Sequence, residues 1–356
     1  MPISVVVGGQ YGSEGKGKVA LAKAREWGAE FVVRVGGTNS GHTAIDRDGR
    51  SRALRQLPVS MLAESTIAVL PPGALIDPVI FLEEVRRLEL PPDRVIVSPF
   101  AGLISTDDKD SERKSGLVDQ IGSTGSGTGA ALIRRIGRSS AVRLAGDEET
   151  LRPYLGDTGA LMRDALRRDR WIVIEGSQGF GLSLLHGGYY PHATSRDTTA
   201  AAFVSEAGLS PLDVREVVLV LRAHPIRVAG NSGPLQYPMT WEELAAEAGL
   251  PSDYKELTTA TRKVRRIGRF EAEVARRAIE ANRPTSIVLN HVDYVDRAVT
   301  IGKRTVRVRD FIARIEEAIG QGVDLVGTAP DQLVQRSEFD MLSEDQPAIR
   351  YSRSGL

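Results

Sequence analysis

The sequence predicts an α/β fold in which helices flank a mostly parallel central sheet. Short apolar runs, many of them rich in Val and Ile, alternate with helical patterns along the whole chain. The first run, Ile3–Val7, passes into a glycine-rich segment and then into a helical pattern that starts near Lys16. Strands that are buried on both faces and joined by crossover helices form parallel sheets, and both observations fit that arrangement.

The expected strands are short apolar segments that are too brief for buried helices. In chain order they are Ile3–Val7, Phe31–Val35, Thr66–Leu70, Arg94–Val97, Trp171–Glu175, Val214–Leu221, Ser286–Leu289 and Asp324–Val326. The expected helices are the longer segments between them. In chain order they are Lys16–Trp27, Asp77–Leu88, Glu148–Arg168, Thr198–Ala207, Thr240–Ala248, Arg269–Ala281 and Arg309–Ile319.

The 356 residues are expected to form one domain, 1–356, with long irregular excursions over residues 105–137, 229–238 and 258–266. The 46 Lys and Arg residues balance the 46 Asp and Glu residues, so net charge favours neither a nucleic acid nor an anionic membrane as partner. The absence of cysteine excludes disulfides and thiolate metal sites. With no visible signal peptide and no apolar run near the ~18 residues of a membrane span, we expect a cytoplasmic protein.

The segment Gly8–Lys18 is predicted to bind phosphate groups. Glycines after a strand let an anion approach the backbone, and the N–H groups of the following helix point at it. Lys16 adds a mobile cation where β- and γ-phosphates would lie. The segment departs from an ordinary P-loop, because five residues separate Gly9 from Gly15 and because Gly17 replaces the usual Ser or Thr. Another group must therefore help to place a metal ion or to polarise the reacting oxygen, and Ser13 lies inside the loop to do so.

Further polar motifs follow other strands. They are Gly36–Thr43, the donor-rich loop Ile121–Gly129, Glu175–Gly179, His192–Asp197 and the basic loop Thr258–Arg266, which packs four cations and three hydroxyls into nine residues. Each motif alone is weakly specific. Their joint occurrence in this order resembles the adenylosuccinate synthetase family from residue 3 to about residue 331. That resemblance implies a fold related to P-loop nucleotide-binding proteins, a homodimer, and a ligase that joins aspartate to C6 of a 6-oxopurine nucleotide while it hydrolyses a nucleoside triphosphate.

The resemblance also implies roles for individual residues. The catalytic group would comprise Ser13, Lys16 and His42, and Mg²⁺ would be held by Ser13 and the carbonyl of Gly41. The donor nucleotide would contact Gly12, Ser13, Glu14, Gly15, Lys16, Gly17, Gly41, His42, Thr43, Asn290, Asp293, Gly327, Ala329 and Pro330. The nucleotide monophosphate would contact Ser13, Asn39, Ser123, Thr124, Arg138, Gln178, Thr194 and Val228, with Arg138 reaching across the dimer. Aspartate would contact Thr259, Thr261, Lys263 and Arg265.

Position 13 departs from the family pattern. Adenylosuccinate synthetases have an aspartate there that takes the proton from purine N1, and a serine hydroxyl is not a general base near neutral pH. Replacement of this aspartate marks a viral branch of the family that makes 2-aminoadenylosuccinate from dGMP, and this chain resembles that branch. The expected substrates are therefore dGMP, aspartate and ATP, in the cytoplasm of a viral host. Ordinary synthesis from IMP with GTP, and an inactive nucleotide-binding regulator, are the alternatives.

Three further departures affect the expected substrates. Lys263 replaces an arginine that contacts the ribose 2′-hydroxyl in the family, which suits a deoxynucleotide. His291 replaces a lysine and Ala329 a glycine near the donor base, so the pocket for that base is altered. ATP is the expected donor on resemblance alone, and GTP is the alternative.

The sequence leaves open what removes the proton from purine N1, with water and polarisation of O6 by His42 and Mg²⁺ as candidates. It offers no role for Arg262.

Overall fold

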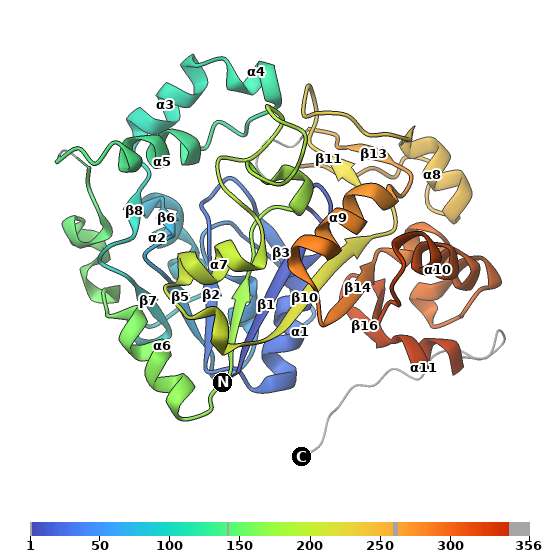
Figure 1. The fold of residues 1–356 in the computed structure, drawn as a ribbon, viewed down its shortest axis with the longest axis horizontal. Helices are drawn as coiled ribbons and strands as arrows, with labels where there is room; N and C mark the ends of the chain where they lie inside the picture. Colours follow the sequence, from blue (N-terminus) through green and yellow to red (C-terminus); the bar gives the residue numbers. More distant parts are fainter. Residues whose placement is uncertain (1, 141, 259–262, 342–356) are drawn as a thin grey trace.

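A nine-stranded sheet forms the centre of the protein, in the order β16-β15-β14-β10-β1-β9-β2-β5-β7 (Figure 1). The computed structural model describes residues 2–140, 142–258 and 263–341. The strands are β1 (Ile3–Gly8), β2 (Phe31–Arg34), β5 (Ile67–Leu70), β7 (Val95–Val97), β9 (Ile172–Glu175), β10 (Val214–Arg222), β14 (Ser286–Asn290), β15 (Leu325–Ala329) and β16 (Gln332–Gln335). Neighbouring strands are parallel, except that β15 and β16 are antiparallel.

Both faces of this sheet are covered, as the sequence predicts. Val5 and Val7 of β1 belong to one apolar cluster, and Val6, which points the other way, belongs to a second. The helices are α1 (Lys16–Trp27), α2 (Pro78–Arg87), α3 (Thr106–Lys114), α4 (Leu117–Ile121), α5 (Thr128–Ile136), α6 (Thr158–Arg167), α7 (Ala200–Ala207), α8 (Trp241–Ala248), α9 (Ala272–Asn282), α10 (Val306–Ile319) and α11 (Arg336–Met341). The predicted fold class is therefore confirmed.

The sequence prediction was wrong in one helix and incomplete elsewhere. The expected helix Glu148–Arg168 is divided into a 3₁₀ segment, Glu149–Tyr154, and helix α6. Pro153 has no N–H to donate, and the side chain of Asp157 accepts from the N–H of Ala160 at 2.9 Å to start the second helix. Strand β16 and the hairpin of β3 (His42–Ile45) and β4 (Ser51–Leu54) were not predicted.

The described parts of the three excursions lie beyond the carboxyl ends of the central strands (Figure 1). The first contains α3, α4 and α5. The described parts of the other two adjoin a small antiparallel sheet of β11 (Ile226–Arg227), β12 (Pro238–Met239) and β13 (Arg266–Gly268). The amide of Asn231 donates to the carbonyl of Gln120 at 2.8 Å and so joins the first two excursions. None of the helices in the described part of the chain combines the length and apolar character that crossing a bilayer requires.

We expect Gly327→Ala to destabilise the protein, because a Cβ there would lie 1.9 Å from Oδ1 of Asn290 and 2.7 Å from Nζ of Lys18. Overpacking at such a site typically costs about 1–3 kcal/mol. Urea unfolding of Gly322→Ala is the matched control, since the described residues leave the space around that Cβ open to 4 Å. Equal free energies of unfolding for the two variants would contradict the close packing of Gly327.

Candidate active site

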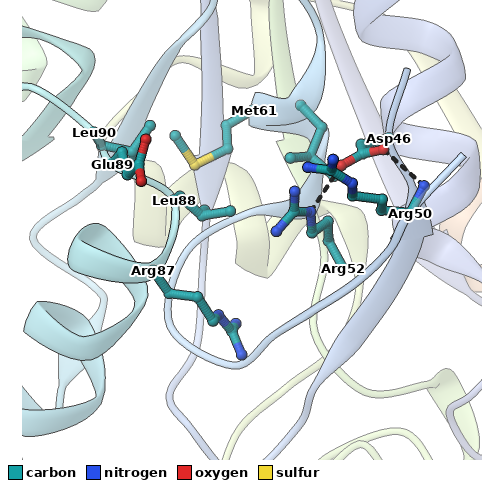
Figure 2. A pocket seen from close by; sticks show the side chains of 9 residues that line it. Asp46, Arg50, Arg52, Met61, Arg87, Leu88, Glu89 and Leu90 are labelled. Carbon is teal, nitrogen blue, oxygen red and sulfur yellow. Dashed lines mark hydrogen bonds and ion pairs between the residues drawn. The ribbon is translucent and has the colours of Figure 1, made fainter. Parts of the chain in front are cut away.

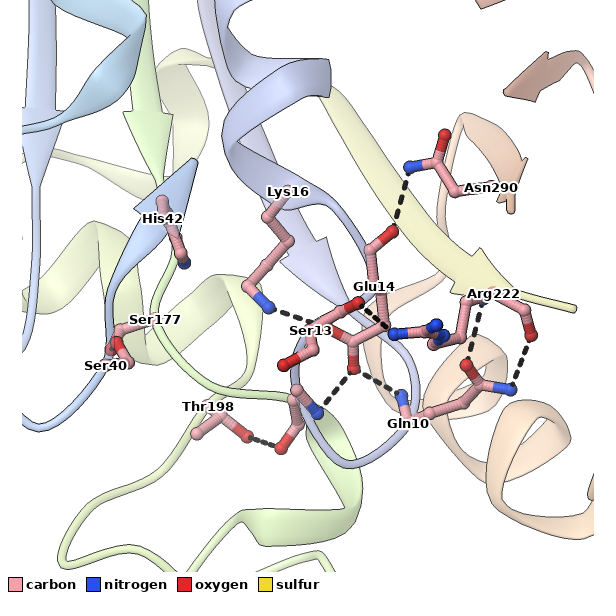
Figure 3. Close-up of polar contacts among 12 residues, drawn as sticks. Gln10, Ser13, Glu14, Lys16, Ser40, His42, Ser177, Thr198, Arg222 and Asn290 are labelled. Atoms are coloured by element: carbon pink, nitrogen blue, oxygen red, sulfur yellow. Dashed lines mark hydrogen bonds and ion pairs between the residues drawn. The ribbon is translucent and has the colours of Figure 1, made fainter. Parts of the chain in front are cut away.

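The loop between β1 and α1 is shaped by its own buried charges. The carboxylate of Glu14 is fully buried and accepts from the N–H groups of Gln10 at 3.1 Å and Gly12 at 2.8 Å (Figure 3). It also pairs with Nζ of Lys16 at 2.7 Å. Gly15 has a φ of 91°, and a Cβ there would lie 2.7 Å from Nδ2 of Asn290, so the turn requires glycine. Glu14 therefore folds the loop and holds Lys16 in place.

Ser13 lies at the exposed tip of this loop in a left-handed backbone conformation, with a φ of 59°. Nη1 of Arg222 donates to its carbonyl oxygen at 3.0 Å. Nη1 of Arg265 donates to its hydroxyl oxygen at 2.7 Å. A non-glycine residue in this region of φ and ψ is uncommon and is retained where its surroundings hold it. Two arginines thus fix both the backbone and the side chain of position 13.

Glu256, which was not predicted from the sequence, is the counter-ion of both arginines. Its two carboxylate oxygens accept from Arg222 at 2.8 Å and from Arg265 at 3.1 Å. The hydroxyl of Tyr294 donates to the same carboxylate at 2.5 Å. Burial alone would raise the pKa of Glu256, but Arg222, His291 and Arg265 outweigh burial and lower this pKa to about 2. Glu256 is therefore ionised at neutral pH.

His42 begins strand β3 and is held by two buried charged residues. Nδ1 of His42 lies 2.6 Å from Oε1 of Glu175, and Nη1 of Arg34 lies 2.7 Å from the same nitrogen. Glu175 also accepts from the N–H and the hydroxyl of Ser60. Burial and the Arg34 guanidinium lower the pKa of His42 to about 4, although Glu175 acts in the opposite direction. The imidazole is neutral at pH 7, and anionic phosphate groups nearby would raise its pKa again.

A cleft of about 190 Å³ joins these groups. Twelve of the predicted site residues line it, namely Gly12, Ser13, Lys16, Asn39, Gly41, His42, Ser123, Thr124, Gln178, Val228, Lys263 and Arg265. Thr194 lies at its edge, where its hydroxyl oxygen accepts from Nδ2 of Asn39 at 3.4 Å. Gly17 lies behind the histidine, since a Cβ there would be 2.9 Å from Cβ of His42. Thr43 is exposed on β3, next to His42.

The residues predicted to face the donor base do not line this cleft. Nδ2 of Asn290 donates to the carbonyl of Glu14 at 2.8 Å. Nζ of Lys18, a residue that was not predicted, donates to the carbonyl of Ala329 at 3.0 Å. Burial raises the pKa of Asp293 to about 6 and lowers that of Lys18 to about 8. The structure thus brings Asn290, Asp293, Gly327, Ala329 and Pro330 to one region next to α1.

Some predicted residues remain apart from the cleft or outside the description. Arg138 is exposed after the end of α5, as a residue that reaches a second subunit would be. Thr259 and Thr261 lie outside the described residues. The described ranges contain no group of three or more His, Asp or Glu side chains that could hold a metal ion. An Mg²⁺ ion would therefore depend on oxygens such as the Gly41 carbonyl and the Ser13 hydroxyl, together with substrate phosphates and water, and these are its preferred ligands.

A larger hollow of about 340 Å³ lies beside the β3–β4 hairpin (Figure 2). It is lined by Asp46, Arg50, Arg52, Met61, Leu62, Arg87, Leu88, Glu89 and Leu90. Nε of Arg52 pairs with Asp46 at 2.7 Å, and Nη2 of Arg87 donates to the carbonyl of Ala53 at 2.7 Å. None of the described predicted site residues lines this hollow. The smaller cleft, which the predicted residues do line, is therefore the candidate active site.

Substitutions of the two charged neighbours should move the pKa of His42 in opposite directions. Glu175→Gln removes the carboxylate that favours the charged imidazole, so the pKa should fall below about 4. Arg34→Met removes the opposing cation, so the pKa should rise toward the ordinary value near 6.5. NMR titration of the histidine side chains measures both shifts, and the half-buried His192 serves as the internal control. Shifts of the same sign in both variants would contradict the arrangement.

Comparison with known proteins identifies the family. A sequence profile described as adenylosuccinate synthetase matches residues 5–147 and 142–304. The adenylosuccinate synthetase of Pyrococcus sp. (strain ST700) is 35% identical over 339 residues, which cover 93% of this chain and 97% of the relative.

Two solved structures are also similar. Succinoaminodeoxyadenylate synthetase of cyanophage S-2L, bound to dGMP and dATP as an energy donor, shares 31% identity with a TM-score of 0.79, over 94% of this chain and 95% of the other. Fully ligated adenylosuccinate synthetase from Plasmodium falciparum has a TM-score of 0.82 at 19% identity, over 94% of this chain and 100% of the other, which supports the fold alone. From the profile and the extent of these matches, this chain belongs to the adenylosuccinate synthetase family of carbon–nitrogen ligases.

Proposed function

We propose that this ligase joins L-aspartate to C6 of dGMP with hydrolysis of ATP. The product would be 2-amino-2′-deoxy-N6-succinyladenylate, a precursor of 2-aminoadenine nucleotides for DNA. The observation that carries the proposal is the uncharged Ser13 at the tip of the phosphate loop, in the cleft that also contains Lys16, His42 and Arg265. The similar cyanophage enzyme, solved with dGMP and dATP, supports the same assignment.

The cleft suits a reaction in two steps. In the first step, O6 of the purine bonds to the terminal phosphorus of ATP, the bond from that phosphorus to ADP breaks, and the proton on N1 leaves. In the second step, the free amine of aspartate bonds to C6 and loses one proton, the C6–O6 bond breaks, and phosphate departs with O6. Lys16 and the loop N–H groups stabilise the negative charge of the phosphoryl group, and His42 is placed to contact O6. Bound Mg²⁺ would neutralise phosphate charge beside Gly41 and Ser13.

Each substrate would have its own set of contacts. ATP would lie along the phosphate loop with its base near Asn290, Asp293 and Ala329. Aspartate has two carboxylates, and the basic loop would supply cations for them through Lys263 and Arg265, together with the predicted Thr259 and Thr261. The residues proposed for dGMP are Ser13, Asn39, Ser123, Thr124, Gln178, Thr194 and Val228, with Arg138 of a second subunit in a homodimer.

A second candidate function is ordinary adenylosuccinate synthesis from IMP with GTP. The 35% identity to an archaeal adenylosuccinate synthetase favours it, as does the retained Asp293, whose carboxylate could accept from the N1–H and N2–H groups of guanine. An inactive nucleotide-binding regulator is disfavoured, because a regulator needs neither the oriented His42 nor the cations of an amino-acid site. The identity of the 6-oxopurine therefore decides between the two enzymes.

Purified protein should release phosphate from ATP only when dGMP and aspartate are both present. The reason is that the phosphorylated purine is consumed by the amine of aspartate. Mass-resolved product analysis over IMP, GMP, dGMP and dIMP, each with ATP and with GTP, measures the preference. Turnover of IMP without turnover of dGMP would replace the proposal with ordinary adenylosuccinate synthesis.

Ser13→Asp should shift the preference from dGMP toward IMP by about tenfold or more. A carboxylate would occupy the space that serine leaves for the 2-amino group of guanine, and it would return the general base of the enzymes that use IMP. The ratio of kcat/KM for the two nucleotides is the measurement. Ser65→Asp is the matched control, since Ser65 is also exposed and has a φ of 60°, close to the 59° of Ser13. An unchanged ratio in Ser13→Asp would show that Ser13 does not determine the choice between dGMP and IMP.

A further inference from the structure

Both oxygens of one carboxylate connect to position 13 through separate arginines. Oε1 of Glu256 pairs with Arg222 at 2.8 Å, and Arg222 donates to the backbone carbonyl of Ser13 at 3.0 Å. Oε2 of Glu256 pairs with Arg265 at 3.1 Å, and Arg265 donates to the hydroxyl of Ser13 at 2.7 Å. The four residues come from the phosphate loop, from the end of β10 and from the two sides of the basic loop. They form a closed two-armed clamp around the tip of the phosphate loop.

The burial of this clamp shows that its geometry is tightly determined. The Arg222 side chain is only 1% exposed, and that of Glu256 is 19% exposed. A charge removed from water needs a partner with good geometry, and loss of that partner is strongly destabilising. Ser13 also needs external support, since its left-handed backbone is disfavoured for a residue with a Cβ. The clamp supplies that support.

One arm of the clamp belongs to the basic loop. The N–H of Arg265 donates to the carbonyl of Glu256 at 2.9 Å, and the N–H of Thr258 donates to the carbonyl of Lys263 at 2.9 Å. An incoming carboxylate that binds Arg265 must share this guanidinium with Glu256 and Ser13. Binding of a carboxylate at Arg265 would therefore alter the support of position 13.

We propose that Glu256 is a positioning residue that fixes the phosphate loop at Ser13 and couples the loop to the binding of a carboxylate at Arg265. The coupling to aspartate rests on the proposed function, whereas the support of the phosphate loop does not. In the proposed reaction, this coupling would align position 13 with the purine when the amino acid is bound.

Hydrogen exchange tests the support of the phosphate loop without any assumption about substrates. In Glu256→Gln, which keeps the shape but removes the charge, peptides covering residues 8–18 and 256–266 should exchange about tenfold faster. Glu247→Gln is the matched control, because Glu247 also pairs with two arginines, Arg269 at 2.6 Å and Arg307 at 3.8 Å, but on the surface. The proposal is wrong if residues 8–18 of Glu256→Gln exchange at the wild-type rate. It is also wrong if the whole chain exchanges faster by the same factor.

Arg265→Met cuts one arm only and serves if Glu256→Gln does not fold. Nη1 of Arg265 donates to both the Ser13 hydroxyl and Glu256, and methionine has no donor to replace it, so residues 8–18 should exchange several-fold faster than in the wild-type protein. Unchanged exchange there would also overturn the proposal.

Kinetics test the coupling. In Glu256→Gln, KM for aspartate should rise about tenfold or more, whereas KM for ATP should rise by a smaller factor, because Glu14 still holds the phosphate loop and Lys16. Equal rises in the KM for aspartate and the KM for ATP would show that Glu256 has only a structural role. If the wild-type protein makes no product from dGMP, the proposed function fails, and the exchange experiment still decides the role of Glu256.

Discussion

The tight passage from β1 into α1 is the constraint on which the rest of the site depends. It needs glycine at position 15, where a Cβ would lie 2.7 Å from Nδ2 of Asn290, and it leaves Ser13 in a left-handed conformation at the tip. The buried carboxylate of Glu14 ties the loop to Lys16 at 2.7 Å. Because β1 is central in the sheet, its carboxyl end places this loop where the excursions meet.

Three carboxylates lie beside polar groups of the site, and two of them, those of Glu14 and Glu175, are fully buried. Glu14 holds Lys16, Glu175 lies beside His42 and Arg34, and Glu256 holds Arg265. The carboxylates keep these groups in fixed positions before an anionic substrate arrives, which is the arrangement that electrostatic catalysis requires. A substrate oxygen must then share these cations with the protein, so binding of one substrate can change the position of groups that contact another.

The sequence was sufficient for the fold class, and residues that it singled out after strands, such as Lys16, Ser13 and His42, line one cleft. Their positions depend on local patterns, a strand, a glycine turn and a helix start, that can be read within one segment. Arg222, Glu256 and Arg34 could not be found in this way, because they have partners that lie far away in the sequence and no motif marks them. Pro153 and Gly156 mark the division of the expected helix 148–168. The helical spacing of the apolar residues on both sides made the segment look like one helix.

The transfer of oxygen-18 from position 6 of dGMP tests the central claim most directly, namely that the loop, position 13 and the purine meet so that O6 is phosphorylated. With labelled dGMP, ATP and aspartate in unlabelled water, the account predicts that each released phosphate carries one oxygen-18 atom. Phosphate without the label, formed together with the succinyl product, would show that O6 leaves by another route and would contradict the account.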